Sequence, residues 1–191
     1  MRTLLILSLC ASALEAQHSR DSWKLKTSAQ TPYSLAGAPV SSSERAQIYR
    51  VVDGATAQYS IRETQRGKQR ELVMNSLVGL ITLAVDGSKQ VLVRGPNSFC
   101  GHSGNCPIWV FVREGARLRL VLEAGGNSLI VRPTSSHGFH ELATAWTFGA
   151  FETEYRDYRW DGAAYKQTDC YLTQYPEAGS GSGPPLIVGC R

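Results

Sequence analysis

A short run between two cysteines, Cys100 and Cys106, constrains this chain more than any other stretch. The run contains two glycines and an asparagine, and the apolar segment 108–112 follows it directly. Turn-forming residues next to β-branched and aromatic residues indicate a loop that enters a buried strand. We therefore expect a cross-linked loop at the start of a core strand.

The N-terminal residues predict export. Arg2 precedes the apolar run 4–10, and small residues around Ala13 and Ala16 offer cleavage sites. This pattern is typical of a secretory signal peptide, and the run is too short to span a membrane. We assign residues 1–16 to a signal peptide and expect a secreted or periplasmic protein without a membrane span.

The remaining cysteines predict a disulfide framework. Cleavage removes Cys10 and leaves an even number of cysteines in an oxidising compartment. Three pairings are possible, and we favour the one in which each bond closes a short loop. Zinc is the competing interpretation, but the C-x5-C spacing is not that of a zinc site. We expect no metal and no cofactor, and disulfides Cys100–Cys106 and Cys170–Cys190.

The net charge of +4 is mild, and cleavage leaves it unchanged because Arg2 and Glu15 are both removed. A nucleic-acid-binding protein usually carries its basic residues on one face or in one run. Here they are scattered among acidic residues along the chain. We therefore expect a mixed, solvated surface and no nucleic-acid partner.

The chain divides into a leader and one domain. Residues 17–43 are rich in Ser, Ala, Thr and Pro and lack an apolar period, which predicts a flexible leader. Residues 44–191 are expected to form a single disulfide-stabilised β-domain. The segment 43–52 predicts at most one short helix, N-capped by Ser43, although its β-branched residues also allow a strand.

From residue 57 the apolar period changes to two, which predicts strands. Asp86-Gly87 lies between two apolar runs and predicts a tight hairpin. Leu118, Leu120 and Leu122 should share one face of a half-solvated strand. The fold class is therefore mainly β: an antiparallel meander of hairpins, sandwich-like or barrel-like. The expected strands are 57–64, 71–75, 80–85, 90–94, 108–112, 117–123 and 128–132, with a turn at 66–68.

Two local patterns mark the last third of the chain. Residues 138–146 read as a glycine–aromatic entry into a strand, and residues 155–165 as a hairpin closed by Asp161-Gly162. Residues 172–189 are expected to form a loop that Cys190 ties back to the domain.

These patterns resemble known repeats. Residues 138–142 resemble the "GxxDL" strand entry of FG-GAP or VCBS repeats, and residues 158–165 resemble their outer hairpin. Those repeats bind calcium through an Asp-rich loop, but residues 132–137 contain no carboxylate, so calcium binding is not implied. Residues 75–171 more closely resemble an uncharacterised family of exported bacterial β-domain proteins. That resemblance implies a compact, exported β-domain and no particular activity.

One cluster of residues offers a possible catalytic site. His137, His140 and Glu141 lie within five residues. A zinc protease places H-E-x-x-H on a helix, whereas Gly138 and a strand would direct the two histidines to opposite faces. This geometry argues against a zinc protease. Two imidazoles and one carboxylate close together nevertheless leave a cell-envelope hydrolase that uses these three residues as an alternative hypothesis.

Our main expectation is a non-enzymatic binding domain, because aromatic residues near arginine suit a sugar ring, a peptide or a protein. The expected partner is an unknown protein or glycan of the cell envelope, bound by a monomer. A lysozyme-type inhibitor with a protruding loop at 97–106 is a further alternative. The candidate binding surface comprises Trp146, His137, His140, Tyr158, Trp160 and Arg159.

Overall fold

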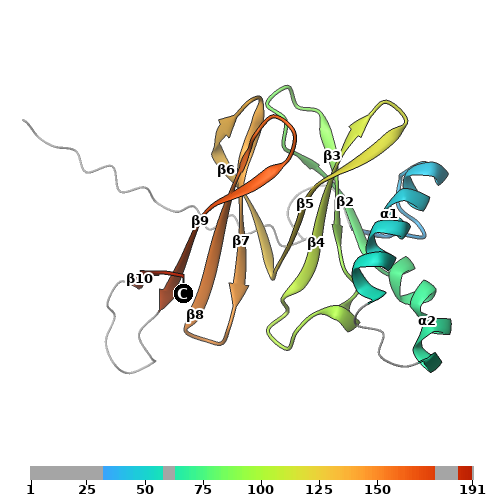
Figure 1. Ribbon diagram of the computed structural model, residues 1–191, viewed down its shortest axis with the longest axis horizontal. Helices are drawn as coiled ribbons and strands as arrows, with labels where there is room; N and C mark the ends of the chain where they lie inside the picture. The colour runs from blue at the N-terminus through green and yellow to red at the C-terminus, as the bar shows by residue number, and fades with distance from the viewer. Residues whose placement is uncertain (1–31, 58–62, 175–184, 191) are drawn as a thin grey trace, which may run out of the picture.

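The structure is a computed structural model that describes residues 32–57, 63–174 and 185–190. Within these ranges the chain forms two antiparallel sheets of five strands each and two α-helices (Figure 1). The mainly β, sandwich-like prediction is therefore confirmed. The expected signal peptide and most of the expected leader lie outside the described residues.

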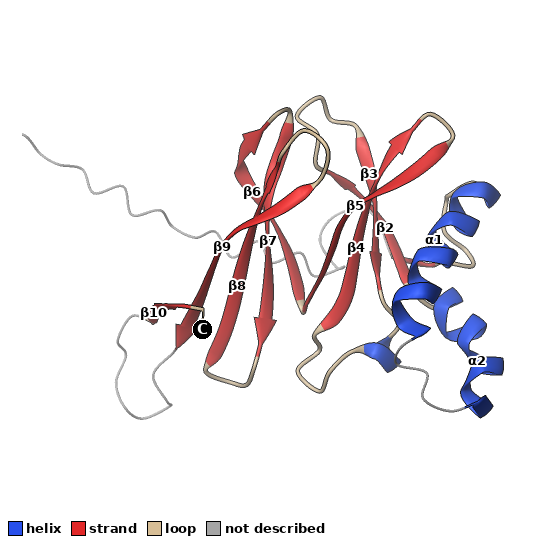
Figure 2. Ribbon diagram, in the orientation of Figure 1, coloured by secondary structure: helices blue, strands red, loops and turns tan. Residues whose placement is uncertain are grey.

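The molecule has three layers. The helices α1 (Ser42–Thr56) and α2 (Glu63–Met74) lie on the same side of the first sheet, and the second sheet lies on its other side (Figure 2). The first sheet is consequently covered on both faces, while no element among the described residues covers the outer face of the second sheet (Figure 2). We call this outer face the open face. This asymmetry places one candidate site on the helices and another on the open face.

The first sheet has the order β1-β2-β3-β4-β5. The expected hairpin at Asp86-Gly87 joins β2 to β3, and Gly87 has φ of 81°, as such a turn requires. The strands are β1 (Tyr33–Ser34), β2 (Leu77–Thr82), β3 (Lys89–Arg94), β4 (Cys106–Glu114) and β5 (Arg117–Gly126).

Two apolar cores lie on opposite faces of this sheet. Ile48 and Val52 of α1 pack on Trp109 and Phe111 of β4 to form the helix-side core. The alternate residues of β4, including Val110, face the second sheet and form the inter-sheet core. A strand that is buried on both faces reads as a continuous apolar run, which is what residues 108–112 show.

The prediction that three leucines of β5 share one face is wrong. Leu122 lies opposite Val110 and Leu120 lies opposite Phe111, so Val121 between them is an extra, bulged residue. Because the bulge breaks the alternation, Leu120 belongs to the helix-side core and Leu122 to the inter-sheet core.

The second sheet has the order β10-β9-β8-β7-β6. The expected hairpin at Asp161-Gly162 joins β8 to β9, and the Asp161 carboxylate accepts the backbone N–H groups of Ala163 and Ala164. The strands are β6 (Ser128–Ser136), β7 (Phe139–Thr147), β8 (Glu152–Trp160), β9 (Tyr165–Gln174) and β10 (Leu186–Gly189).

Glycines at the end of β5 allow the two sheets to approach closely. A Cβ atom on Gly125 would lie 2.5 Å from Cζ3 of Trp146, so the indole packs where only a glycine fits. Gly126 has φ of 148°, and a side chain there would collide with the carbonyl oxygen of Ala145. Elsewhere, the backbone N–H of His140 donates to Leu83 O at 2.8 Å and links the sheets a second time.

Two predictions near the N-terminus need correction. The fold includes residues 32–43, which were expected to belong to a flexible leader, because Leu35 and Ala38 are buried in the helix-side core. Ser41 rather than Ser43 caps α1, and it forms a reciprocal capping box with Glu44.

The predictions of a strand at 71–75 and a turn at 66–68 are also wrong, because residues 66–74 lie in α2. The prediction of at most one helix therefore fails as well. Gly67 looked like a turn residue, yet Gln, Arg, Lys and Glu dominate the surrounding sequence and favour a helix. The part of the expected strand 57–64 that contains Tyr59 and Ile61 lies outside the described residues.

The predicted disulfides are confirmed: Cys100 is bonded to Cys106, and Cys170 to Cys190. The expected loop 172–189 is wrong at both ends, and its residues 175–184 lie outside the described residues. Residues 172–174 complete β9, and β10 pairs with them as an edge strand that the second disulfide holds in place.

No helix among the described residues is long and apolar enough to cross a membrane.

Candidate functional site

Two aromatic residues of the expected binding surface are part of the core. Tyr158 is 7% exposed and Trp160 is 4% exposed, and both belong to the inter-sheet core. The Trp160 ring stacks on Phe139 with a centroid distance of 4.4 Å and meets Tyr165 edge-on at 5.2 Å. These rings stabilise the sandwich and present little surface to a ligand.

The other expected surface residues are dispersed. Trp146 is half-buried against Gly125 at the junction of the sheets. His137 is exposed in the β6–β7 turn with φ of 47°, and its Nδ1 lies 3.2 Å from Trp160 O. His140 Nδ1 is buried without a hydrogen-bond partner among the described residues. The structure therefore does not gather these residues around one ligand.

The three residues of the hydrolase hypothesis, all among the described residues, do not form a group whose ligand atoms lie within 4.8 Å of one another. Glu141 accepts a hydrogen bond from Thr134 at 2.7 Å and pairs with Arg159 at 2.8 Å. The Thr134 bond lowers the pKa of Glu141, burial opposes this, and Arg159 lowers the pKa further, so the carboxylate is ionised and engaged.

Among the described residues, one group of three potential metal ligands has its ligand atoms within 4.8 Å of one another: Glu154, Cys170 and Cys190. The two sulfurs of this group are bonded to each other in a disulfide. They are therefore not available as thiolates for a metal ion.

The disulfide loop is anchored to the second sheet by one side chain. The Asn105 amide donates to Thr147 O at 2.7 Å and accepts the Thr147 N–H at 3.0 Å. These two bonds reproduce the pairing that a neighbouring strand would provide. His102 and Ser103 are exposed at the tip of the loop.

A polar recess of about 450 Å³ opens on the free face of the second sheet. Arg132 pairs with Asp157 at 2.7 Å, and Arg159 with Glu141 at 2.8 Å. We call this site the paired-charge recess. Its polar lining comprises Arg132, Thr134, Glu141, Asp157, Arg159, Thr168 and Asp169.

Arg132 is the hub of this recess. Its Nη2 donates both to Asp157 and, at 3.0 Å, to the hydroxyl of Tyr171. Burial alone would lower the pKa of Arg132, but the bonds to Asp157 and Tyr171 raise it overall. The Tyr171 ring stacks on Tyr155 with a centroid distance of 5.2 Å, so an aromatic pair adjoins the recess.

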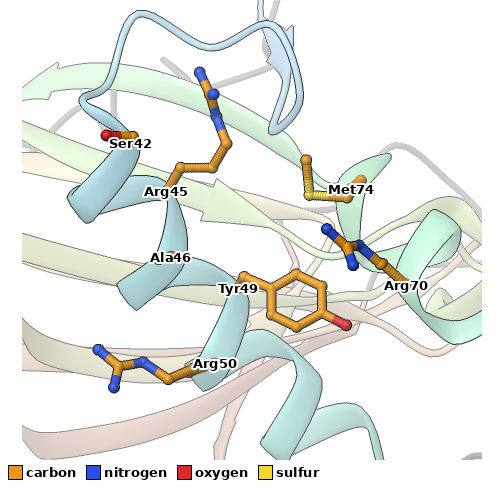
Figure 3. Close-up of a pocket in the computed structure, with 7 residues that line it drawn as sticks. All are labelled: Ser42, Arg45, Ala46, Tyr49, Arg50, Arg70 and Met74. Atoms are coloured by element: carbon orange, nitrogen blue, oxygen red, sulfur yellow. The ribbon is translucent and has the colours of Figure 1, made fainter.

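A larger groove of about 690 Å³ lies on the helices. In Figure 3, the Arg70 guanidinium lies between Met74 and the Tyr49 ring, while Arg45 and Arg50 extend from this cluster in different directions. We call this site the α1–α2 groove. Its lining comprises Ser42, Arg45, Ala46, Tyr49, Arg50, Arg70 and Met74.

The arginines of the α1–α2 groove lack anionic partners. No carboxylate of the described residues lies within ion-pair distance of Arg45, Arg50 or Arg70. Arg45 donates to the carbonyl oxygens of Leu35 and Ala38, at 3.0 and 3.2 Å, and these neutral groups leave its charge uncompensated.

Both acidic residues of α1 interact with other groups, Glu44 away from the groove and Asp53 with Tyr49 of the groove lining. Glu44 pairs with Arg113 at 2.7 Å and caps the helix at Ser41. Asp53 interacts with Tyr49, and burial together with this carboxylate raises the pKa of the Tyr49 hydroxyl. The groove therefore combines a positive rim with an apolar floor and suits an anionic ligand.

Sequence analysis missed this groove. The helical spacing of Arg45 and Tyr49, four residues apart, was an available signal for a shared helix face. Arg70 was assigned no role because a turn and a strand were expected around it, and only a second helix brings it to α1.

Comparison with known proteins adds no family to this geometry. No protein-family model matches the chain, and neither a curated protein nor a solved structure is significantly similar to it.

Proposed function

We propose that this chain is an exported, non-enzymatic binding domain whose α1–α2 groove binds an extended anionic ligand. The observation that carries the proposal is the absence of carboxylate partners, among the described residues, for the three arginines that line the groove. A guanidinium without a carboxylate partner keeps its positive charge available for charge-assisted hydrogen bonds to a bound anion, although Arg45 already uses two of its N–H groups on Leu35 and Ala38.

The spread of the arginines argues for an extended ligand. Arg70 lies beside Tyr49, whereas Arg45 and Arg50 extend away from that ring in different directions (Figure 3). A single small ion would contact only part of this set. A longer molecule with several anionic groups would contact all three side chains and also cover Ala46 and Met74.

The alternatives have weaker support. A hydrolase would need a free base, and the carboxylate of Glu141 is already bonded to Thr134 and Arg159. A lysozyme-type inhibitor would use the loop 97–106, which is cross-linked and exposed at its tip. Lysozymes are often basic, however, and unpaired arginines would slow the encounter with a basic partner.

Binding to a heparin-derived hexasaccharide, measured by titration calorimetry at low salt, tests the proposal. The variant Arg50→Gln/Arg70→Gln should bind about tenfold or more weakly, because two charge-assisted contacts are lost. The control is Arg117→Gln, which removes the same charge from an exposed position in the first sheet outside the groove.

Equal weakening in the Arg117→Gln variant would show that only net charge matters and would contradict the proposal. An unchanged affinity in the double variant would also contradict it. Inorganic phosphate provides a further comparison: if the ligand is extended, phosphate should compete with the hexasaccharide only weakly.

A further inference from the structure

The paired-charge recess carries an inference of its own. We infer that this recess on the open face of the second sheet is a binding site for a neutral sugar. The inference goes beyond the proposed function, because the recess is separate from the α1–α2 groove. Asp157 and Arg159 alternate along β8 with Tyr158 and Trp160 of the inter-sheet core and therefore lie on the opposite face of the sheet.

The charges of the recess favour a neutral ligand. Arg132 and Arg159 are each paired with a carboxylate, so neither guanidinium is free to attract an anion strongly. A third carboxylate, Asp169, would repel an anion further. The carboxylates do not form a metal site, because no three potential ligands of the recess, all in the described part of the chain, have their ligand atoms within 4.8 Å of one another.

The hydrogen-bonding capacity of the recess remains large. A guanidinium has five N–H donors and a carboxylate has about four acceptor positions, and each pair here is joined by one bond that the structure shows. Every sugar hydroxyl is both a donor and an acceptor. Two adjacent hydroxyls of one ring can therefore accept from Arg132 and donate to Asp157 without breaking the pair.

An aromatic surface completes the site. Tyr155 and Asp157 are two residues apart on β8 and therefore lie on the same face of the sheet. Tyr155 stacks on Tyr171, whose hydroxyl accepts a hydrogen bond from Arg132. Polar groups that fix orientation beside apolar ring surface are the usual composition of a small-molecule site, and the C–H faces of a sugar suit such rings.

The recess is also rigid enough to be pre-formed. The Arg132–Asp157 pair joins β6 to β8, and the Arg159–Glu141 pair joins β8 to β7. Cross-strand pairs of this kind hold planar groups in fixed positions before a ligand arrives. Less side-chain ordering is then required on binding, which favours a measurable affinity for a small sugar.

Chitotriose, a neutral trisaccharide, is a suitable probe, and saturation-transfer NMR with calorimetry is the measurement. The full chain should bind it saturably with a Kd of about 1 mM or lower, the range of weak specific sites. Asp157→Asn should weaken binding about tenfold, because one carboxylate oxygen becomes an NH2 donor and the other loses the charge that strengthens its hydrogen bonds to Arg132 and the sugar.

Tyr171→Phe removes only a hydroxyl and provides a second variant in case Asp157→Asn unfolds the chain. It should weaken binding severalfold. Glu123→Gln, an exposed carboxylate of the first sheet outside the recess, should leave binding unchanged. Arg50→Gln/Arg70→Gln should also leave chitotriose binding intact, which separates this inference from the proposed function.

Two results would overturn the inference. One is the absence of saturable binding by chitotriose, and equally by cellotriose and maltotriose, up to about 10 mM, where even a weak site would fill. The other is binding that persists unchanged in both Asp157→Asn and Tyr171→Phe.

Discussion

The paired-charge recess and the α1–α2 groove contain the same kind of side chain in opposite electrostatic states. In the recess, the alignment of the strands places Arg132 of β6 against Asp157 of β8, across β7, and Arg159 of β8 against Glu141 of the neighbouring β7. In the groove, the nearby Glu44 is bonded to Arg113 instead. By arginine content alone, with two in the recess and three in the groove, both regions would be considered basic. Which partner each arginine has, rather than how many there are, decides whether a surface attracts an anion.

The covering of the two sheets explains this contrast. The first sheet is buried on both faces, so its helices contribute apolar residues inward and leave their arginines at the rim of the groove. Among the described residues no element covers the open face of the second sheet, and charged residues pair there between strands, Arg159 with Glu141 on the adjacent strand and Arg132 with Asp157 across β7. The predictions below test this contrast, beginning with the helix layer.

The largest effect is expected from Ile48→Ala. Ile48 is fully buried between α1 and β4, and removal of its side chain should destabilise the fold by about 2–5 kcal/mol. Denaturant unfolding gives the free energy. The same substitution at Ile187, which is 62% exposed on the edge strand β10, should change it by less than about 0.5 kcal/mol. Equal losses would show that the helix layer is not part of the core.

A smaller loss is expected from Asn105→Ala, which breaks the connection between the two sheets. The N–H and C=O of Thr147 would lose their partners, which should cost about 1–3 kcal/mol. Asn97→Ala, which removes an exposed amide bonded to Arg94, is the matched control and should cost about 0.5 kcal/mol or less. A loss at Asn105 no larger than that at Asn97 would mean that water replaces both bonds.

Much of the sheet structure could be predicted because it depends on local signals. Period-two patterns and Asp-Gly turns located the hairpins at 86–87 and 161–162, and loop length identified both disulfides. The bulge at Val121 could not be predicted in this way. The sequence of β5 reads as a regular alternating strand whether or not one of its residues is bulged. Only the register with β4 shows that the alternation changes at Val121.

The candidate sites were harder to predict because they depend on contacts between distant residues. Tyr158 and Trp160 were expected at a binding surface. They lie two residues apart on β8 and therefore share one face of the sheet, and this face is the one buried in the core. Arg132 and Asp157 meet only because β6 and β8 lie on either side of β7. The proximity of Arg70 on α2 to Tyr49 on α1 depends on how the two helices pack, which no spacing pattern in the sequence indicates.

The next prediction compares one arginine from each region. Arg132→Gln should destabilise the fold by about 0.5–1 kcal/mol, because its pair with Asp157 is only 21% and 29% exposed at the two side chains. Arg50→Gln should be neutral within about 0.5 kcal/mol, since Arg50 has no carboxylate partner among the described residues.

Thermal unfolding of both variants provides the comparison. A double-mutant cycle of Arg132→Gln with Asp157→Asn isolates the coupling between the two groups. A coupling free energy near zero would show that the pair is no stronger than a fully exposed one.

The smallest effect concerns pH and again separates the two regions. The hydrogen bond from Thr134, opposed by burial and supported by Arg159, lowers the pKa of Glu141 below its usual 4.5 in the folded state. A lowered carboxyl pKa stabilises the fold above pH 4.5, and this contribution disappears as the pH falls through the folded-state pKa of Glu141.

In Glu141→Gln, the free energy of unfolding should therefore decline less steeply below pH 4.5. Arg70→Gln should follow the wild-type slope, because the lining of the α1–α2 groove, as far as the chain is described, contains no carboxylate. Equal slopes in the wild type and Glu141→Gln would mean that the charge of Glu141 is as well accommodated in the unfolded chain as in the recess.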